Sequence, residues 1–138
     1  MAIPKVSGIE TEYGIVVRDA DLNAVTASSM LINAFLGRTQ TKTAWDFFDE
    51  QPGNDARGLL LNEILAPEIE THLVNTVLTN GARYYVDHAH PECSTPECRT
   101  TTETVLYDRA AEEIMRLSME RAKSMLGNGG EIVVYKNN

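Results

Sequence analysis

Residues 80–92, with the sequence NGARYYVDHAHPE, constrain the fold more than any other stretch of the chain. They begin with an Asn-Gly dipeptide, which is typical of two-residue β-hairpin turns because both turn positions require a positive φ. Residues 77–78 then end the first arm of the hairpin, and the aromatic and β-branched residues that follow predict the second strand. Side chains alternate along a strand, so Arg83, Tyr85 and Asp87 project from one face. We interpret this face as the wall of a binding site for a charged ligand.

A second acidic pattern lies in residues 4–17, whose composition favours a strand. Glu10 and Glu12 are two positions apart, so they share one face of that strand. Two interpretations remain open at this point. The two carboxylates either face solvent without a ligand, or they belong to a Mg²⁺ site, in which carboxylates, waters and phosphates supply octahedral oxygen ligands.

The charge of the chain limits the classes of partner that it can have. Twelve Lys and Arg residues against 20 Asp and Glu residues give a formal net charge of −8. A nucleic-acid-binding module normally shows a basic face, so we expect no nucleic-acid partner. A phosphate ligand held together with a divalent cation stays compatible with this charge, because the protein must then supply carboxylates.

Length and cysteine content indicate the broad class of protein. A chain of 138 residues is long enough for one domain with a hydrophobic core. No apolar run approaches the roughly 18–20 residues that span a bilayer, so we expect no membrane association. The N-terminus carries no apolar signal-peptide core. Cys93 and Cys98 lie too close together to build a disulfide framework, so we expect free thiols and a cytoplasmic protein.

Two helices are predicted from capping residues and apolar spacing. Thr26 is the expected N-cap of a helix through residues 28–36, which Gly37 ends. A longer helix over residues 102–126 begins at a Thr-x-x-Glu capping box. The apolar residues of the longer helix that recur at steps of three and four, and that we expect to face the core, are Tyr107, Ala110, Ala111, Ile114, Ser118, Ala122, Met125 and Leu126.

The remaining segments differ in regularity. Residues 131–135 are β-branched and aromatic and predict a final strand. Residues 38–66 show no clean periodicity around an isolated aromatic cluster, and a connection of this length is typically a functional loop or a disordered insertion. We therefore expect a flexible insertion there.

A zinc site is the first chemical alternative to consider. His88, His90, Cys93 and Cys98 are residues of the types that bind zinc, but their spacing is irregular and contains no C-x₂-C unit. The tripeptide His-Pro-Glu also matches the H-x-E of zinc deaminases, whose P-C-x-x-C partner motif is missing here. We therefore set zinc aside.

The set of residues that survives combines acids, one phenol and one arginine on two predicted strands: Glu10, Glu12, Arg83, Tyr85, Asp87 and Glu92. Glu92 follows Pro91, which we expect to force a turn. If the two strands share a sheet, the carboxylates hold Mg²⁺ and Arg83 binds phosphate oxygens. Asp87 is then the acid left for chemistry, as base or nucleophile. The alternative is a salt-bridged sheet surface without a ligand.

Three segments of the chain resemble the family of Pup ligases and Pup deamidase/depupylases. These segments are residues 8–14 (GIETEYG), residues 80–92 and residues 135–138 (YKNN), in the order in which the family carries them. Members of this family attach or remove Pup, a small protein that tags bacterial proteins for the proteasome. The resemblance implies an α+β fold of the glutamine-synthetase type, in which a curved antiparallel sheet packed by helices cradles ATP and Mg²⁺.

The depupylase branch of the family is the more similar one. Its form of the central block is YVDHAHPE, as here, and residues 38–66 resemble a flexible loop of that branch. The implied activity is the ATP- and Mg²⁺-dependent removal of Pup from lysine isopeptide bonds and the deamidation of the C-terminal glutamine of Pup. Pup and pupylated proteins are the implied partners. A Pup–protein ligase and a non-catalytic Pup-binding module are the alternatives.

The resemblance also implies ligand contacts at individual residues. Glu10, Tyr85 and Glu92 resemble the Mg²⁺ ligands of the family. Arg83 and Thr95 resemble contacts to ATP.

Asp87 resembles the catalytic aspartate, which acts as the base in ligases and as a nucleophile, or as the group that orients one, in depupylases. Glu12 fits the family motif without an implied role. Family members are several times longer than this chain. We therefore expect residues 1–138 to be the N-terminal part of the catalytic cradle domain and to require the rest of a longer chain for activity.

Overall fold

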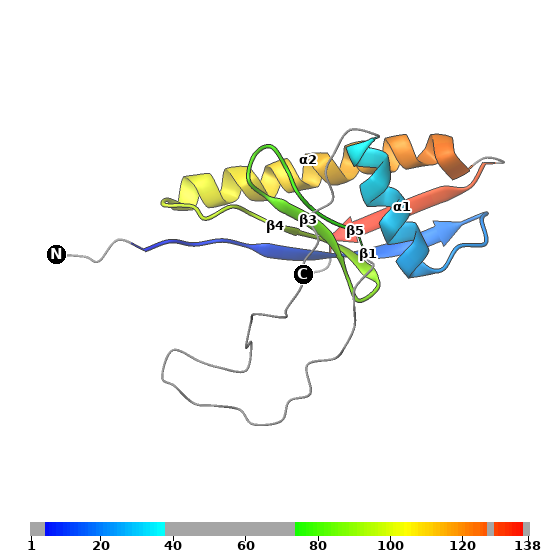
Figure 1. Ribbon diagram of the computed structural model, residues 1–138, viewed down its shortest axis with the longest axis horizontal. Coiled ribbons are helices and arrows are strands. Elements are labelled where there is room, and N and C mark those ends of the chain that lie inside the picture. Colours follow the sequence, from blue (N-terminus) through cyan, green and yellow to red (C-terminus); the bar gives the residue numbers. More distant parts are fainter. Residues whose placement is uncertain (1–4, 38–73, 127–128, 137–138) are drawn as a thin grey trace, which may run out of the picture.

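The computed structural model describes residues 5–37, 74–126 and 129–136, and these form one antiparallel sheet with two helices on one of its faces (Figure 1). The strand order is β2-β3-β4-β1-β5. The elements are β1 (Glu10–Arg18), α1 (Ala24–Leu36), β2 (Asn75–Val77), β3 (Arg83–Asp87), β4 (His90–Ser94), α2 (Thr101–Leu126) and β5 (Glu131–Lys136). The predicted α+β class and antiparallel sheet are therefore confirmed. The insertion expected at residues 38–66 lies outside the described residues.

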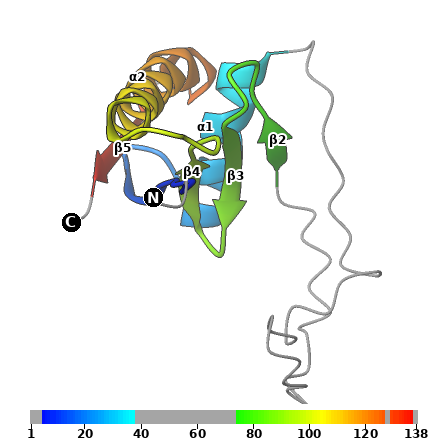
Figure 2. The same cartoon turned by 90° about the vertical axis from the view of Figure 1, so that its left-hand side faces the viewer.

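β1 is the longest strand and holds the sheet together by pairing with two different partners. Its first part pairs with β4, from Glu10 opposite Ser94 to Glu12 opposite Glu92. From Tyr13 onward it pairs with β5 on its other side. β5 and β2 consequently form the two edges of the sheet, on opposite sides of the molecule (Figure 2).

The β2–β3 hairpin forms where the Asn-Gly dipeptide predicts it, but its turn is longer than two residues. Leu78 donates its N–H to the Ala82 carbonyl over 2.7 Å, which encloses a three-residue loop. Gly81 alone in this loop has a positive φ, of 84°, while the Asn80 side chain accepts a hydrogen bond from the Ala82 N–H over 3.1 Å. The prediction that both residues need a positive φ is wrong, because a three-residue loop places only its last residue, a glycine, in the left-handed region.

The turn expected at Pro91 lies earlier in the chain. Pro91 is a buried residue inside β4, opposite Val86, and the chain reverses at His88 and Ala89, where His88 has a φ of 51°. The Val86 N–H points away from β4 and donates to the carbonyl of Val74, the residue just before β2. By the pleat, the Pro91 nitrogen faces away from β3, toward the side of β1, where pairing ends at Glu92. Proline is tolerated there because no ladder hydrogen bond needs its missing N–H.

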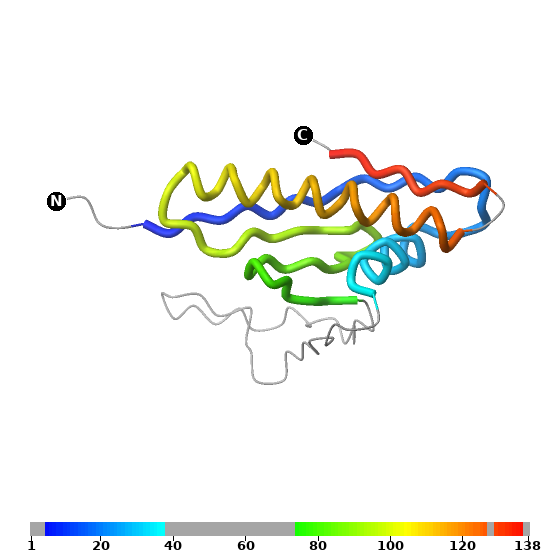
Figure 3. Tube along the Cα trace, turned by 90° about the horizontal axis from the view of Figure 1, so that it is seen from above, coloured from blue at the N-terminus to red at the C-terminus, as the bar shows by residue number. Residues whose placement is uncertain are grey.

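Both helices pack on the same face of the sheet, which we call the helix face (Figure 3). Tyr84 of β3 shows this arrangement, because it is fully buried between them. Its ring meets the Phe35 ring of α1 edge-on at 6.2 Å, and its hydroxyl donates to Ser118 Oγ of α2 over 3.1 Å. Tyr13, Cys93 and the other core residues of the strands point to this face by alternation.

α1 begins two residues before the predicted cap. Its N-cap is Asn23, whose side chain accepts a hydrogen bond from the Thr26 N–H over 2.8 Å. Thr26 is therefore the third residue of the helix and not its N-cap. Gly37 ends the helix as predicted, with a φ of 63° and its N–H on the Asn33 carbonyl. Ser28 Oγ donates to the Ala89 carbonyl over 2.7 Å, which fixes the β3–β4 turn against the helix.

α2 agrees closely with its predicted range and begins at the predicted capping box. Thr100 Oγ1 accepts from the Glu103 N–H, and the Glu103 carboxylate reaches back to the Arg99 N–H over 2.8 Å. Ala111, Ser118 and Ala122 are buried as expected, together with Thr104 and Met115. Met125 is 55% exposed, so its predicted place in the core is wrong. Neither described helix has the length and apolarity needed to cross a membrane.

Candidate functional site

The face of the sheet opposite the helices, which we call the open face, carries most of the predicted site. Strand register aligns its side chains in rows, because Glu12, Glu92 and Tyr85 are successive cross-strand partners, as are Glu10, Ser94 and Arg83. The polar and aromatic residues that alternation places on the open face of β1, β2, β3 and β4 are Glu10, Glu12, Asn75, Arg83, Tyr85, Asp87, His90, Glu92 and Ser94.

Tyr85 joins the carboxylates of two different strands. Its hydroxyl donates to Glu10 Oε1 over 3.2 Å and makes a short hydrogen bond with Glu92 Oε1. Ser94 Oγ lies 3.0 Å from Glu10 Oε1 and 3.2 Å from the Tyr85 oxygen. The three residues predicted to surround one cation therefore lie together in the structure. Burial, followed by the hydrogen bond to Glu92, raises the pKa of the Tyr85 phenol, so it stays protonated and can donate.

Glu92 is the most buried acid of the group, with only 7% of its surface exposed. Burial is the largest cause that raises the pKa of its carboxyl, and the charges of Asp87, Glu10 and Glu12 raise it further. The hydrogen bond from Tyr85 acts in the opposite direction. Several negative charges thus lie close to the buried Glu92 carboxyl, and a cation bound there would reduce their mutual repulsion.

Arg83 lies over the aromatic face of Tyr85. Its guanidinium carbon is 3.7 Å from the ring centroid, within the range of a cation–π contact. Its Nε donates to Asn75 Oδ1 of the edge strand β2 over 2.9 Å. The cation and the carboxylates therefore flank the same phenol, as their shared strand face predicts.

The other two acids of the set lie at the β3–β4 turn and beside it. Glu12 Oε1 is 2.5 Å from His90 Nδ1. Asp87 is opposite His90 in the strand register, is about half exposed, and lies 3.1 Å from His88 Nδ1. Asp87 shares the open face with Tyr85 and raises the pKa of Glu92 through its charge. It is an accessible carboxylate beside the carboxylate pair.

Two further candidates lie elsewhere. Thr95 follows Ser94, and its hydroxyl accepts from the Ile9 N–H over 3.0 Å, which ties β4 to the segment before β1 rather than to Arg83. Cys93 points to the helix face, where burial is the largest cause that raises its pKa to about 12, so it stays a thiol. Two of the four residues of the zinc alternative, Cys93 and His90, are thus on opposite faces of the sheet. In the described ranges no three His, Cys, Asp or Glu side chains are grouped in a way that could hold a metal ion.

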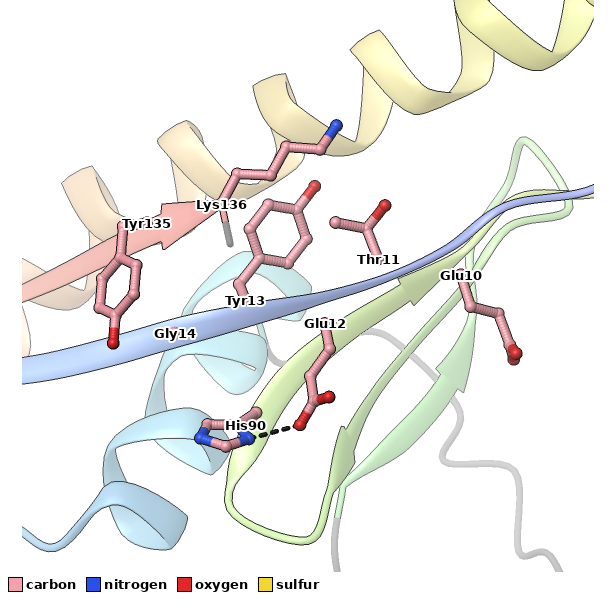
Figure 4. A pocket seen from close by; sticks show the side chains of 8 residues that line it. All are labelled: Glu10, Thr11, Glu12, Tyr13, Gly14, His90, Tyr135 and Lys136. Carbon is pink, nitrogen blue, oxygen red and sulfur yellow. Dashed lines mark hydrogen bonds and ion pairs between the residues drawn. The ribbon is translucent and has the colours of Figure 1, made fainter. Parts of the chain in front are cut away.

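A polar cavity of about 430 Å³ adjoins this cluster along β1 (Figure 4). Glu12 and His90 lie at one side of it, joined by their ion pair, and Tyr135 lies across Gly14. Its lining residues are Glu10, Thr11, Glu12, Tyr13, Gly14, His90, Tyr135 and Lys136. Glu10 belongs both to this cavity and to the Tyr85 cluster, so the cavity and the cluster are continuous.

A comparison with known families identifies the origin of this arrangement. Residues 5–138 match the family model described as Pup-ligase protein. The chain belongs to this family. A depupylase of Acidothermus cellulolyticus is 46% identical over 97% of the chain and 28% of its own length. A Pup deamidase/depupylase of Mycobacterium tuberculosis is 36% identical with the same coverages. A Pup–protein ligase of Corynebacterium diphtheriae is 38% identical over 46% of the chain and 14% of its own length.

The fold is also similar to that of a solved member of the Pup-ligase family. The crystal structure of the complex between prokaryotic ubiquitin-like protein Pup and its ligase PafA matches with a TM-score of 0.64 and 21% identity. The match covers 96% of this chain and 22% of the PafA chain. The predicted fold, an antiparallel sheet packed by helices, is thereby confirmed as the fold of the matching part of the PafA chain. The chain spans 28% of the length of the depupylases that it matches.

Sequence reasoning missed three residues of this site: Asn75, His90 as the partner of Glu12, and Ser94. Alternation in β4 would have revealed two of them, because His90, Glu92 and Ser94 share one face. The expected turn at Pro91 hid this pattern. Asn75 could not be found in the same way, because its place depends on the register between β2 and β3.

Proposed function

We propose that this chain is the N-terminal part of an ATP- and Mg²⁺-dependent depupylase of the cytoplasm. The complete enzyme would remove Pup from lysine isopeptide bonds and deamidate the C-terminal glutamine of Pup. The observation that carries this proposal is the phenol-bridged carboxylate pair Glu10–Tyr85–Glu92 with Arg83 beside it and Asp87 on the same face. The depupylases of Acidothermus cellulolyticus and Mycobacterium tuberculosis match 97% of the chain, whereas the Pup–protein ligases of Mycolicibacterium vanbaalenii and Corynebacterium diphtheriae match 46%.

The donor set fits Mg²⁺. Glu10, Tyr85 and Glu92 offer oxygen atoms, which are the ligands that this hard cation prefers, and Ser94 adds another oxygen. Burial and, after it, like charges raise the pKa of Glu92, and the charge of a divalent cation would counteract this rise. When bound, the cation would neutralise phosphate charge on the nucleotide.

Arg83 and Thr95 are the proposed contacts to ATP. The Arg83 guanidinium lies over Tyr85 and is thereby held beside the carboxylates that would bind the cation. A guanidinium offers paired N–H groups that match phosphate oxygens in geometry and charge. Thr95 would contribute from the end of β4, where its hydroxyl is close to the segment before β1.

Asp87 is the proposed catalytic residue. It is about half exposed at the end of β3, so the carbonyl carbon of an amide or isopeptide bond can reach it. Its carboxylate would act on that carbon as the nucleophile, or would hold the group that attacks it. The bond between the carbonyl carbon of Pup and the nitrogen then breaks, and the nitrogen takes up a proton and leaves as ammonia in deamidation or as the lysine side chain in depupylation. One water supplies the new carboxylate oxygen of Pup, either by direct attack or by hydrolysis of the acyl intermediate on Asp87.

The substitution Asp87→Asn in the full-length protein tests this function. The variant keeps the shape of the side chain and removes its charge, so Pup turnover should fall at least about 10²-fold even if only general-base assistance is lost. ATP binding should survive, because its contacts are assigned to other residues. Turnover of Pup ending in glutamine and calorimetric titration with Mg²⁺–ATP on the same preparation measure both effects. Asp21→Asn, an exposed acid outside the open face, is the matched control.

The outcomes separate the possibilities. Near wild-type turnover by Asp87→Asn would show that Asp87 is not catalytic, and a loss of ATP binding would make it a ligand or a fold-holding residue. A wild-type protein that conjugates Pup ending in glutamate, and does not release Pup, would be a ligase. A protein that binds Pup but never ATP would be a non-catalytic Pup-binding module.

A further inference from the structure

The open face includes a side chain that the proposed function does not use. Asn75 is the first residue of β2, the edge strand, and register places it directly opposite Tyr85 of β3. Its side chain therefore projects from the same face as Tyr85 and Arg83, diagonally across the hairpin from the arginine. Asn75 is half-buried there and has a carboxamide oxygen available as an acceptor.

The contact between Asn75 and Arg83 is specific in its geometry. Arg83 Nε donates to Asn75 Oδ1 over 2.9 Å, a normal length for a hydrogen bond from a charged donor. The guanidinium group is planar, so fixing its Nε–H direction restricts the orientation of the whole plane. The second restraint is the Tyr85 ring, 3.7 Å below the guanidinium carbon. The ring contact restricts the distance of the guanidinium plane from Tyr85, and the hydrogen bond restricts the orientation of that plane.

This restraint matters because a free arginine samples many rotamers. Ordering the side chain costs conformational entropy, and a side chain that is already ordered loses less on binding. The Tyr85 ring alone tolerates sliding and rotation of the guanidinium, whereas a directional hydrogen bond does not. Asn75 thus supplies the directional part of the restraint.

We propose that Asn75 is a positioning residue that orients the Arg83 guanidinium for the nucleotide phosphates. This inference rests on the proposed function, in which Arg83 contacts ATP. Asn75 does not touch the reacting atoms, so it acts through Arg83. Its removal raises the KM for ATP more than it lowers kcat.

The test uses the full-length protein with ATP, Mg²⁺ and Pup ending in glutamine. Asn75→Ala removes the acceptor, and the KM for ATP should rise at least about 10-fold, the lower end of the usual effect of losing one hydrogen bond to a charged group. Asn75→Asp keeps an oxygen acceptor for Arg83 Nε and should restore a KM within about twofold of wild type. Val105→Ala changes an exposed side chain of α2, away from the open face, and serves as the control.

A double-mutant cycle shows whether the effect passes through Arg83. Asn75→Ala should have no further effect on the KM for ATP in an Arg83→Ala background, because the group that it positions is then absent. Thermal unfolding of every variant identifies losses caused by unfolding. If Asn75→Ala does not fold, Asn75→Val favours the strand, lacks the acceptor and carries the same test.

Three results would overturn the inference: an unchanged KM for Asn75→Ala, an equal effect with and without Arg83, or an Asn75→Asp variant as impaired as Asn75→Ala. Failure of the proposed function has a different signature. In that case the wild-type protein itself releases no Pup and no ammonia, whatever stands at position 75. Calorimetric titration with Mg²⁺–ATP would then still measure whether Asn75 and Arg83 act together on nucleotide affinity.

Discussion

At Glu92, burial and three neighbouring carboxylates act in the same direction on one side chain. A carboxyl group whose pKa is raised on folding destabilises the folded state once it is ionised. We therefore expect Glu92→Gln to raise the thermal midpoint of the metal-free protein at neutral pH, because the amide still accepts from Tyr85 and carries no charge. The difference should shrink as the pH falls through the raised pKa, because the wild-type carboxyl then takes up a proton.

Addition of Mg²⁺ should reverse the order of the two proteins. Under the proposed function the cation would bind the folded wild type and stabilise it by mass action, whereas Glu92→Gln would lack one ligand. Thermal unfolding with EDTA, with Mg²⁺ and with Mg²⁺–ATP measures both halves of this prediction. A variant that gains as much from Mg²⁺ as the wild type would exclude Glu92 as a ligand. Glu97→Gln, an exposed acid after β4, is the control.

The residues of the site were predictable to different degrees. Alternation along two strands places Glu10, Tyr85 and Glu92 on sheet faces, but only the register of β1, β3 and β4 brings them together. Spacing could not predict that these three residues lie on the same face of one sheet, and this expectation came from the family resemblance. Asn75 carried no local signal, because its place depends on the pairing of β2 with β3, whereas the alternation in β4 that reveals Ser94 was hidden by the turn expected at Pro91.

Among the elements, the β2–β3 loop depends on one backbone conformation. Gly81 has a φ of 84°, and a Cβ at this position would meet Pro96 Cβ at 3.4 Å, an ordinary contact. Space is therefore available, and the cost of a side chain is conformational. We expect Gly81→Ala to lower the free energy of unfolding by about 1–2 kcal/mol. Gly81→Asn should cost less, because asparagine tolerates the left-handed region better. Urea denaturation of the three proteins measures this order, and equal midpoints would contradict it.

The two wrong predictions about elements, the turn at Pro91 and the core position of Met125, both concern features that tertiary contacts decide. Pro91 was expected to force a turn because proline commonly does, yet β4 accepts it where the pairing with β1 has ended. Met125 fits a core stripe by periodicity, yet it is 55% exposed near the end of α2, since tertiary contacts decide which part of a helix meets the sheet. Where caps and turn residues act locally, as at Gly37 and the start of α2, the prediction is confirmed.

In the molecule as a whole, the two faces of the sheet have separate roles. The helices bury the apolar side chains of one face, and Ser28 and Lys136 tie the strands to α1 and α2 at the Ala89 carbonyl and at Asp108. On the open face, the charged and polar side chains of β1, β3 and β4 contact one another around Tyr85. A sheet held rigid from one side can therefore position charged groups on the other without burying them in the core.

The last prediction concerns the size of the binding site. On the open face, Glu10, Glu12, Asp87 and Glu92 outweigh the positive charge of Arg83, and the chain carries a net charge of −8. A nucleotide triphosphate is itself strongly negative, so its binding needs more cationic groups than these residues supply. We expect the 138-residue chain alone to bind Mg²⁺–ATP at least about 100-fold more weakly than the full-length protein, which corresponds to the loss of two hydrogen bonds between charged groups. Calorimetric titration of both proteins measures this ratio, with far-UV circular dichroism to verify that the shorter chain is folded. Equal dissociation constants would show that these residues alone complete the nucleotide site.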